Sequence, residues 1–88
     1  MIARRVVVHG RVQAVGFRVS AASRAQSRGL AGWVRNLPDG TVEAMFEGEP
    51  DAVDSLVRWC SEGPRGAAVA HVDVSDESPE GLTSFEIR

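Results

Sequence analysis

A strand, turn and strand pattern in the middle of the chain restricts the possible folds more than any other feature of the sequence. Residues 32–37 have the composition of a short strand, and Pro38-Asp39-Gly40 after them is a turn signal. Residues 41–47 then alternate between an apolar and a polar face, with Val42, Ala44 and Phe46 against Thr41, Glu43 and Glu47. This pattern predicts a β-hairpin.

Two helices are predicted, one on each side of the hairpin in the chain. The first spans about residues 17–28, ends at Gly29 and has four residues at helical spacing: Phe17, Ala21, Ala22 and Ala25. The second has Pro50 in its first turn and stops at Gly63-Pro64. Its core-facing stripe consists of Val53, Leu56, Val57 and Cys60.

Three further strands are predicted at residues 5–9, 68–74 and 85–87. The first ends where Gly10 begins a loop, and the second has an alternating apolar face of Ala68, Ala70, Val72 and Val74. The element order is β-α-β-β-α-β with a short extra C-terminal strand, and two such helices pack best on one face of a mainly antiparallel sheet. The predicted fold class is therefore α+β, a ferredoxin-like sandwich in which residues 1–88 form a single domain. This fold serves many functions and does not specify one.

The composition argues against nucleic-acid and membrane partners. The 88 residues carry a formal net charge of -2, so no bulk positive charge attracts nucleic acid or an anionic membrane. The apolar run Val6-Val7-Val8 is too short for a signal peptide or a membrane span. Cys60 is the only cysteine and cannot form an internal disulfide. We expect a cytoplasmic monomer without a cofactor.

The segment from Gly10 to Arg18 is the strongest candidate for a binding site. A helix start leaves backbone N–H groups without internal partners, and Ser, Thr, Asp or Asn usually caps them. The segment contains none of these residues and no acid, and Arg18 puts a positive charge at the positive end of the helix dipole. A bound anion would explain all three features. The alternative is that water satisfies the amides and Arg18 lies along the surface.

Asn36 is the only asparagine in the chain and the second candidate. Asparagine is depleted in strands, and this one lies just before the predicted turn. A turn-initiating asparagine that bonds its own backbone is the commoner explanation. The functional alternative is a neutral amide that both donates to and accepts from a water molecule.

Two motifs resemble the paired signatures of the acylphosphatase family: Gly10-x-Val12-Gln13-x-Val15-x-Phe17-Arg18 and Gly32-x-Val34-x-Asn36-x-x-Asp39-Gly40-x-Val42-Glu43. The element order is also similar to that of the family, and the resemblance covers essentially the whole chain. One position departs from the pattern, because the family usually has glycine where this chain has Ala14. If that position needs a positive φ, Ala14 strains the loop by about 1 kcal/mol.

The resemblance implies metal-independent hydrolysis of a small acyl phosphate to a carboxylate and inorganic phosphate. Arg18 would clamp the phosphoryl group, Asn36 would hold the attacking water, and backbone amides would cradle the phosphoryl oxygens, namely those of Gln13, Ala14, Val15, Gly16 and Phe17. Because a carboxylate leaves without being protonated, no general acid is required. Positioning and charge stabilisation carry most of such a reaction.

Two other sets of residues suggest different phosphatase chemistry and fit it less well. His9, His71 and Asp73 could meet if the first and fourth strands are neighbours, but a zinc site needs three or four well-anchored ligands. Cys60 and Arg65 do not match the Cys-x5-Arg loop of cysteine phosphatases, and Cys60 completes an apolar helix stripe. We therefore predict no metal site and a packing role for Cys60.

Two alternative functions use the same fold. An RNA-binding module would need paired aromatics on the central strands and a basic face, whereas the strands offer Trp33 and Phe46 on an acidic chain. We predict that Trp33 and Trp59 are packing residues instead. The other alternative is a regulatory or carboxyl-phosphate-processing domain that keeps the anion site with little turnover.

Overall fold

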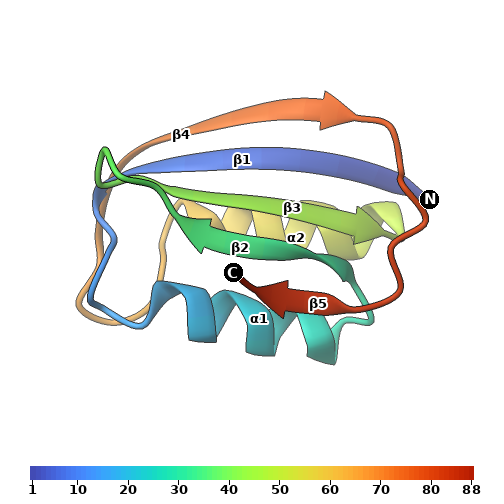
Figure 1. The fold of residues 1–88 in the computed structure, drawn as a ribbon, viewed down its shortest axis with the longest axis horizontal. Coiled ribbons are helices and arrows are strands. Elements are labelled where there is room, and N and C mark those ends of the chain that lie inside the picture. Colours follow the sequence, from blue (N-terminus) through green and yellow to red (C-terminus); the bar gives the residue numbers. More distant parts are fainter.

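Five strands and two helices make up most of the chain, and the computed structural model describes all 88 residues. In chain order the elements are β1 (Ile2–Arg11), α1 (Phe17–Ser27), β2 (Ala31–Asn36), β3 (Val42–Gly48), α2 (Pro50–Cys60), β4 (Ala68–Glu77) and β5 (Phe85–Ile87). The strands form one sheet in the order β4-β1-β3-β2-β5, and only the β2–β5 pair is parallel. Both helices cover the same face of this sheet (Figure 1). The predicted ferredoxin-like α+β arrangement with an extra C-terminal strand is confirmed.

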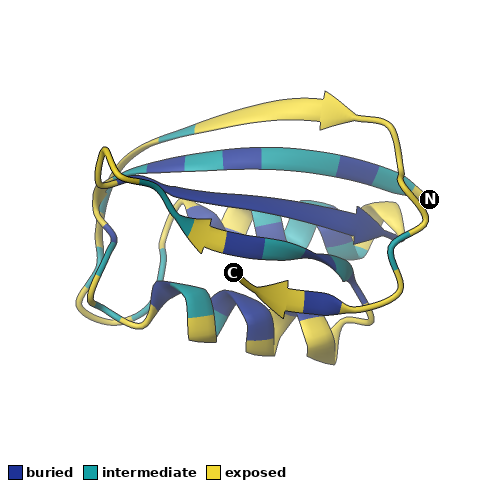
Figure 2. Ribbon diagram, in the orientation of Figure 1, coloured by how far each residue is buried: buried dark blue, intermediate teal, exposed yellow.

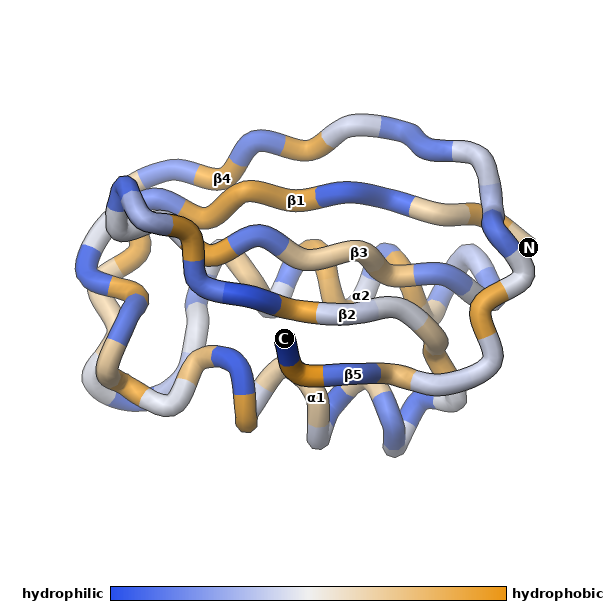
Figure 3. The backbone as a smooth tube through the Cα atoms, viewed as in Figure 1, coloured by the Kyte–Doolittle hydropathy of each residue, from blue (hydrophilic) through white to orange (hydrophobic).

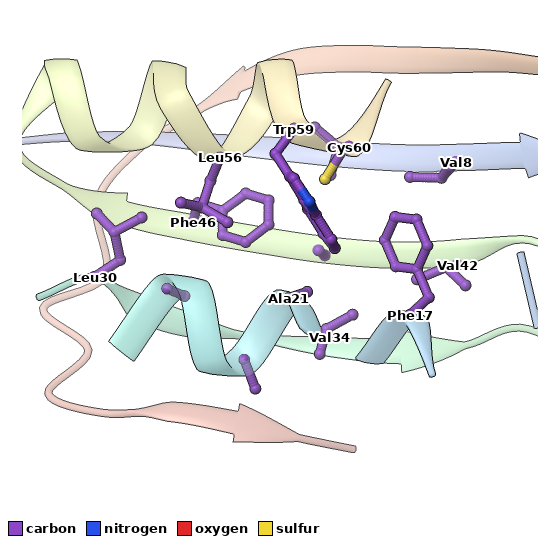
Figure 4. Close-up of a cluster of buried hydrophobic side chains, with 14 of the residues drawn as sticks. Val8, Phe17, Ala21, Leu30, Val34, Val42, Phe46, Leu56, Trp59 and Cys60 are labelled. Carbon is purple, nitrogen blue, oxygen red and sulfur yellow. The ribbon is translucent and has the colours of Figure 1, made fainter. Parts of the chain in front are cut away.

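The core lies between the helices and the sheet and contains a cluster of 17 buried residues. The central strand β3 is buried along its whole length (Figure 2). In α2 the predicted stripe is confirmed for Val53, Leu56 and Cys60, whereas Val57 is only partly buried. Trp59 is buried as well, because its ring packs on Phe17 with 5.1 Å between the ring centroids (Figure 4). This contact joins the two helices.

β1 is longer than the sequence pattern predicts, and the loop does not begin at Gly10. A β-bulge between His9 and Gly10 shifts the register of β1 against β4 and lets the strand continue to Arg11. Gly10 has a φ of 125°, and a Cβ atom there would lie 2.2 Å from the carbonyl oxygen of Ala68. Only glycine fits this position. The bulge therefore sets where the chain leaves the sheet before α1.

The predicted apolar face of β4 is confirmed only at Val72, because Ala68, Ala70 and Val74 are exposed and Val69 packs against the core instead. Polar and apolar residues alternate along β4 (Figure 3), but nearly all of the strand is exposed (Figure 2). β4 is an edge strand, and the helices lie beneath the other strands. Val74 is consequently 47% exposed although it pairs with Val6, which is fully buried.

The polar face of β3 is buried too, because arginine side chains cover one of its glutamates and backbone N–H groups satisfy the other. Glu43 accepts hydrogen bonds from Arg5 and Arg35, at 2.5 and 2.6 Å. Burial alone would raise the pKa of Glu43, but the two guanidinium groups outweigh it and hold the pKa below its usual value. Glu47 accepts three backbone N–H groups, from Glu80, Gly81 and Leu82, at 2.7, 3.0 and 3.0 Å. Glu47 thereby fastens the segment that leads into β5.

Candidate active site

The first turn of α1 has free backbone N–H groups, as the sequence predicts. Gly16 is the N-cap residue, with φ 78° and ψ 21°, and no side chain caps the helix. The first turn contains no acid, so the positive end of the helix dipole has no negative partner within the protein. Phe17 anchors this turn in the core. The turn offers N–H donors and positive potential to an anion.

The loop before α1 is fixed where it leaves β1. Val12 is fully buried. The side chain of Gln13 donates to the carbonyl oxygens of Leu37 and Thr41, at 2.8 and 2.9 Å, and so ties the loop to the β2–β3 turn. Sequence analysis considered only the backbone amide of Gln13, since the partners of its side chain lie more than twenty residues further along the chain.

Ala14 is the only residue other than glycine with a positive φ, at 61°. This is the left-handed region, which residues with a Cβ atom avoid. The condition for strain set out from the sequence is therefore met. Ala14 is exposed, so its methyl group gains little from packing.

Arg18 lies between the loop and the end of β5. Its guanidinium Nη1 donates to the backbone carbonyl oxygen of Arg88 at 3.1 Å. β5 runs parallel to β2 and ends beside the start of α1 (Figure 1). Arg88 N–H in turn donates to the carbonyl oxygen of Val34 at 2.8 Å. This chain of contacts holds Arg18 at the helix N-terminus, and the sequence pattern gave no indication of it.

Asn36 ends β2 with its side chain on the helix-covered face of the sheet. It pairs with Val42, a buried core residue, and cross-strand partners share a face. Asp39, not Asn36, accepts the hydrogen bonds of the turn, from the backbone N–H of Thr41 at 3.0 Å and its hydroxyl at 2.6 Å. These bonds lower the pKa of Asp39. The turn-forming explanation of Asn36 is therefore not supported.

One cavity of about 160 Å³ joins these parts. Its lining residues are Val12, Ala14, Gly16, Phe17, Arg18, Val19, Asn36 and Ile87. Of the predicted site residues it brings together Arg18, Asn36 and three loop positions, whereas Gln13 and Val15 lie outside the lining. Val12, Val19 and Ile87 line the cavity but were not predicted as site residues. Arg18 is the only charged residue of the lining, so the cavity favours an anion.

The histidines proposed as an alternative metal site do lie together, on the sheet face away from the helices. His9 pairs with His71 across β1 and β4, and the carboxylate of Asp73 lies 2.9 Å from one imidazole and 2.6 Å from the other. These contacts lower the pKa of Asp73. No group of three or more His, Cys, Asp or Glu side chains has an arrangement suited to a metal ion.

The remaining candidates have packing roles. Cys60 is fully buried, and burial raises the pKa of its thiol to about 12, far from that of a nucleophilic cysteine. Phe46 is also fully buried and stacks on Phe85. Trp33 lies on the opposite sheet face, and the guanidinium groups of Arg35 and Arg88 each lie 5.1 Å from the centroid of its ring. The two strand aromatics thus cannot form one base-stacking platform.

Fold and cavity together define a small ferredoxin-like protein with a cavity beside the uncapped start of its first helix. Neither helix is long and apolar enough to cross a membrane. A family model described as Acylphosphatase matches residues 4–87. The acylphosphatase of a Nostoc species is 56% identical over 88 residues, which cover all of this chain and 87% of that protein. The chain therefore belongs to the acylphosphatase family and is a hydrolase of acyl phosphates.

Solved structures agree with this assignment. The crystal structure of acylphosphatase from Bacillus subtilis is 40% identical and superimposes with a TM-score of 0.96, covering all of this chain and 99% of that one. The same fold also occurs within a much larger protein. HypF from T. kodakarensis is 29% identical with a TM-score of 0.85, and the match covers all of this chain but 12% of HypF.

Proposed function

We propose that the α1 N-terminus and Arg18 hold the phosphoryl group of the acyl phosphate. The backbone amides of residues 13–17 and the guanidinium of Arg18 would donate hydrogen bonds to the phosphoryl oxygens. One observation supports this placement of the phosphoryl group: the uncapped first turn of α1 lies beside a cavity in which Arg18 is the only charged residue. A guanidinium can donate to two phosphate oxygens at once, and its contact with Arg88 keeps it preorganised.

Asn36 is the residue proposed to position the attacking water. Asn36 lines the same cavity as Arg18. Its amide is not needed for the turn, because Asp39 accepts the hydrogen bond from the Thr41 N–H there. A side-chain amide accepts a hydrogen bond from the water through its oxygen and donates one to a phosphoryl oxygen through its NH2 group, and its own charge does not change. It therefore orients the nucleophile while Arg18 and the amides stabilise the charge on the transferred group.

The proposed reaction needs neither a general acid nor a metal. The leaving carboxylate is stable as an anion, and the cavity lining contains no residue that titrates near neutral pH. Hydrolysis of acetyl phosphate should persist in a chelator, and ordinary phosphate monoesters, whose alkoxide leaving groups require protonation, should be poor substrates.

Two substitutions separate the proposed roles. Arg18→Gln should weaken both phosphate binding and turnover, because the guanidinium contacts the anion before and during the reaction. Asn36→Ala should keep phosphate binding and lose about 10²–10³-fold in kcat. Arg28→Gln, at the other end of α1, is the matched control and should retain both. A near-normal kcat for Asn36→Ala would show that Asn36 does not position the water. Slow turnover by the wild-type protein with intact phosphate binding would favour the regulatory alternative.

We also propose that residues 1–88 act as one monomeric domain in the cytoplasm. One buried cluster draws on both helices and on all strands except β4, which supports a single unit. The exposed edge strand β4 carries Asp73, Asp76 and Glu77, and like charges oppose pairing of two β4 edges. Cys60 is a buried free thiol, as in reducing compartments. Sedimentation equilibrium tests the monomer.

A further inference from the structure

The cavity has a polar side and an apolar side. The polar side consists of Arg18, Asn36 and the loop backbone, which the proposed function assigns to the phosphoryl group and water. Five of the eight lining residues are hydrophobic. Val12 and Phe17 are buried in the core, whereas Val19 and Ile87 are 66% and 48% exposed. The exposed pair therefore forms an apolar rim, to which the proposed phosphate chemistry gives no role.

This rim is unusual for the molecule as a whole. Only four large hydrophobic side chains are exposed: Met1, Val19, Val74 and Ile87. Single exposed apolar residues need no explanation. Val19 and Ile87 are different, because α1 and β5 bring them from distant parts of the sequence to the same cavity. Met1 is the first residue and Val74 lies on the opposite edge strand of the sheet.

We infer that Val19 and Ile87 bind the acyl group and give the enzyme a preference for apolar acyl phosphates. The inference rests on the proposed placement of the phosphoryl group. When the loop amides hold that group, the acyl group must extend away from them, and the rim holds the two large exposed apolar side chains of the lining. Because Val19 and Ile87 are exposed to solvent, they would contact only one side of an acyl chain. Such a contact favours apolar acyl chains but does not select a particular chain length.

The expected size of the preference follows from the exposure of the rim. Full burial of a methylene group strengthens binding about fourfold. A rim about half covered should give about twofold per methylene, and so about a fourfold higher kcat/KM for butyryl phosphate than for acetyl phosphate. The corresponding carboxylic acids have nearly equal acidity. The chemistry of the leaving group therefore stays constant along the series, and the ratio reports contact with the rim.

The test compares acetyl, propionyl and butyryl phosphate in wild type and in the double variant Val19→Ser/Ile87→Ser. The butyryl-to-acetyl ratio should fall to about one in the double variant, while inhibition by inorganic phosphate stays as in wild type. Val74→Ser is the matched control, since Val74 is 47% exposed but lies far from the cavity. It should keep the wild-type ratio.

Three results would overturn the inference. The first is a wild-type ratio near one with good acetyl phosphate hydrolysis, which leaves the proposed function intact. The second is a double variant that keeps the wild-type ratio. The third is a double variant whose inhibition by phosphate weakens as much as its ratio falls, because the rim would then act on the loop rather than on the acyl group. No hydrolysis of any acyl phosphate would overturn the proposed function together with the inference.

Discussion

Replacing Ala14 by glycine should stabilise the protein, against the usual effect of an alanine-to-glycine change. A residue with a Cβ atom loses about 1–2 kcal/mol in the left-handed region, where Ala14 lies at φ 61°. Glycine removes that strain but also gives the unfolded chain more freedom, which costs about 0.4–1 kcal/mol. The exposed methyl group contributes little. The net gain should be about 0.5–1 kcal/mol.

Thermal denaturation followed by circular dichroism measures this gain. For a domain of this size, it corresponds to a rise in Tm of about 2–8 °C. Ala52→Gly is the opposite control, because Ala52 has helical backbone in α2 and packs against the core, so glycine there should lower Tm. The strain is present without a ligand, so the gain should appear in stability more than in phosphate affinity. An unchanged or lower Tm for Ala14→Gly would refute the reasoning from the φ angle.

Three further predictions follow from the site and its supports. Phosphate at ten times its Kd should stabilise the fold by about 1.4 kcal/mol and raise Tm by roughly 5–10 °C, an effect that chloride should not reproduce and Arg18→Gln should largely abolish. Glu47→Ala should lower the free energy of unfolding in urea by about 2–3 kcal/mol and also reduce kcat, because the three N–H groups of the segment before β5 lose their charged acceptor. An unchanged kcat would show that the position of β5 does not affect the site. The pKa of Glu43 is lowered in the folded state, so the stability that its charge contributes is complete above the ordinary pKa and is lost as pH falls through the folded-state pKa. The difference in unfolding free energy between wild type and Glu43→Gln should therefore be smaller at about pH 3 than at about pH 7. An equal difference at both pH values would contradict the lowered pKa.

The fold was largely predictable because local patterns agree with one another. The hairpin, the two helices and the short last strand were all predicted, with ends that differ from the structure by a few residues. The error at Gly10 arose because a glycine before a loop looks the same in the sequence as a glycine in a bulge. Only the approach of Ala68 from β4 distinguishes them. The apolar face of β4 was predicted to be buried for a similar reason. Alternation of apolar and polar residues in the sequence does not reveal whether a helix covers the strand.

The site was predictable where its chemistry is local and not where it depends on long-range contacts. The uncapped start of α1 is a property of neighbouring residues, so the loop and Arg18 could be inferred from the sequence. The possible strain at Ala14 was inferred from the resemblance to the acylphosphatase family. The Gln13 side chain, the carbonyl of Arg88 and the side chain of Ile87 reach the site only through the register of distant strands. The burial of Glu43 likewise depends on two arginines from different strands.

The short strand β5 has a consequence for the motions of the molecule. It has three residues, lies at an edge of the sheet and contributes Ile87 to the cavity lining. Edge elements of this kind open with much less free energy than central strands such as β3, and they do so while the rest of the fold stays intact. Amide hydrogens of β5 should therefore exchange with solvent faster than those of β3. Each such opening would release Arg18 from Arg88, so the lifetime of a complete site is set by the detachment of one edge strand and not by unfolding of the whole chain.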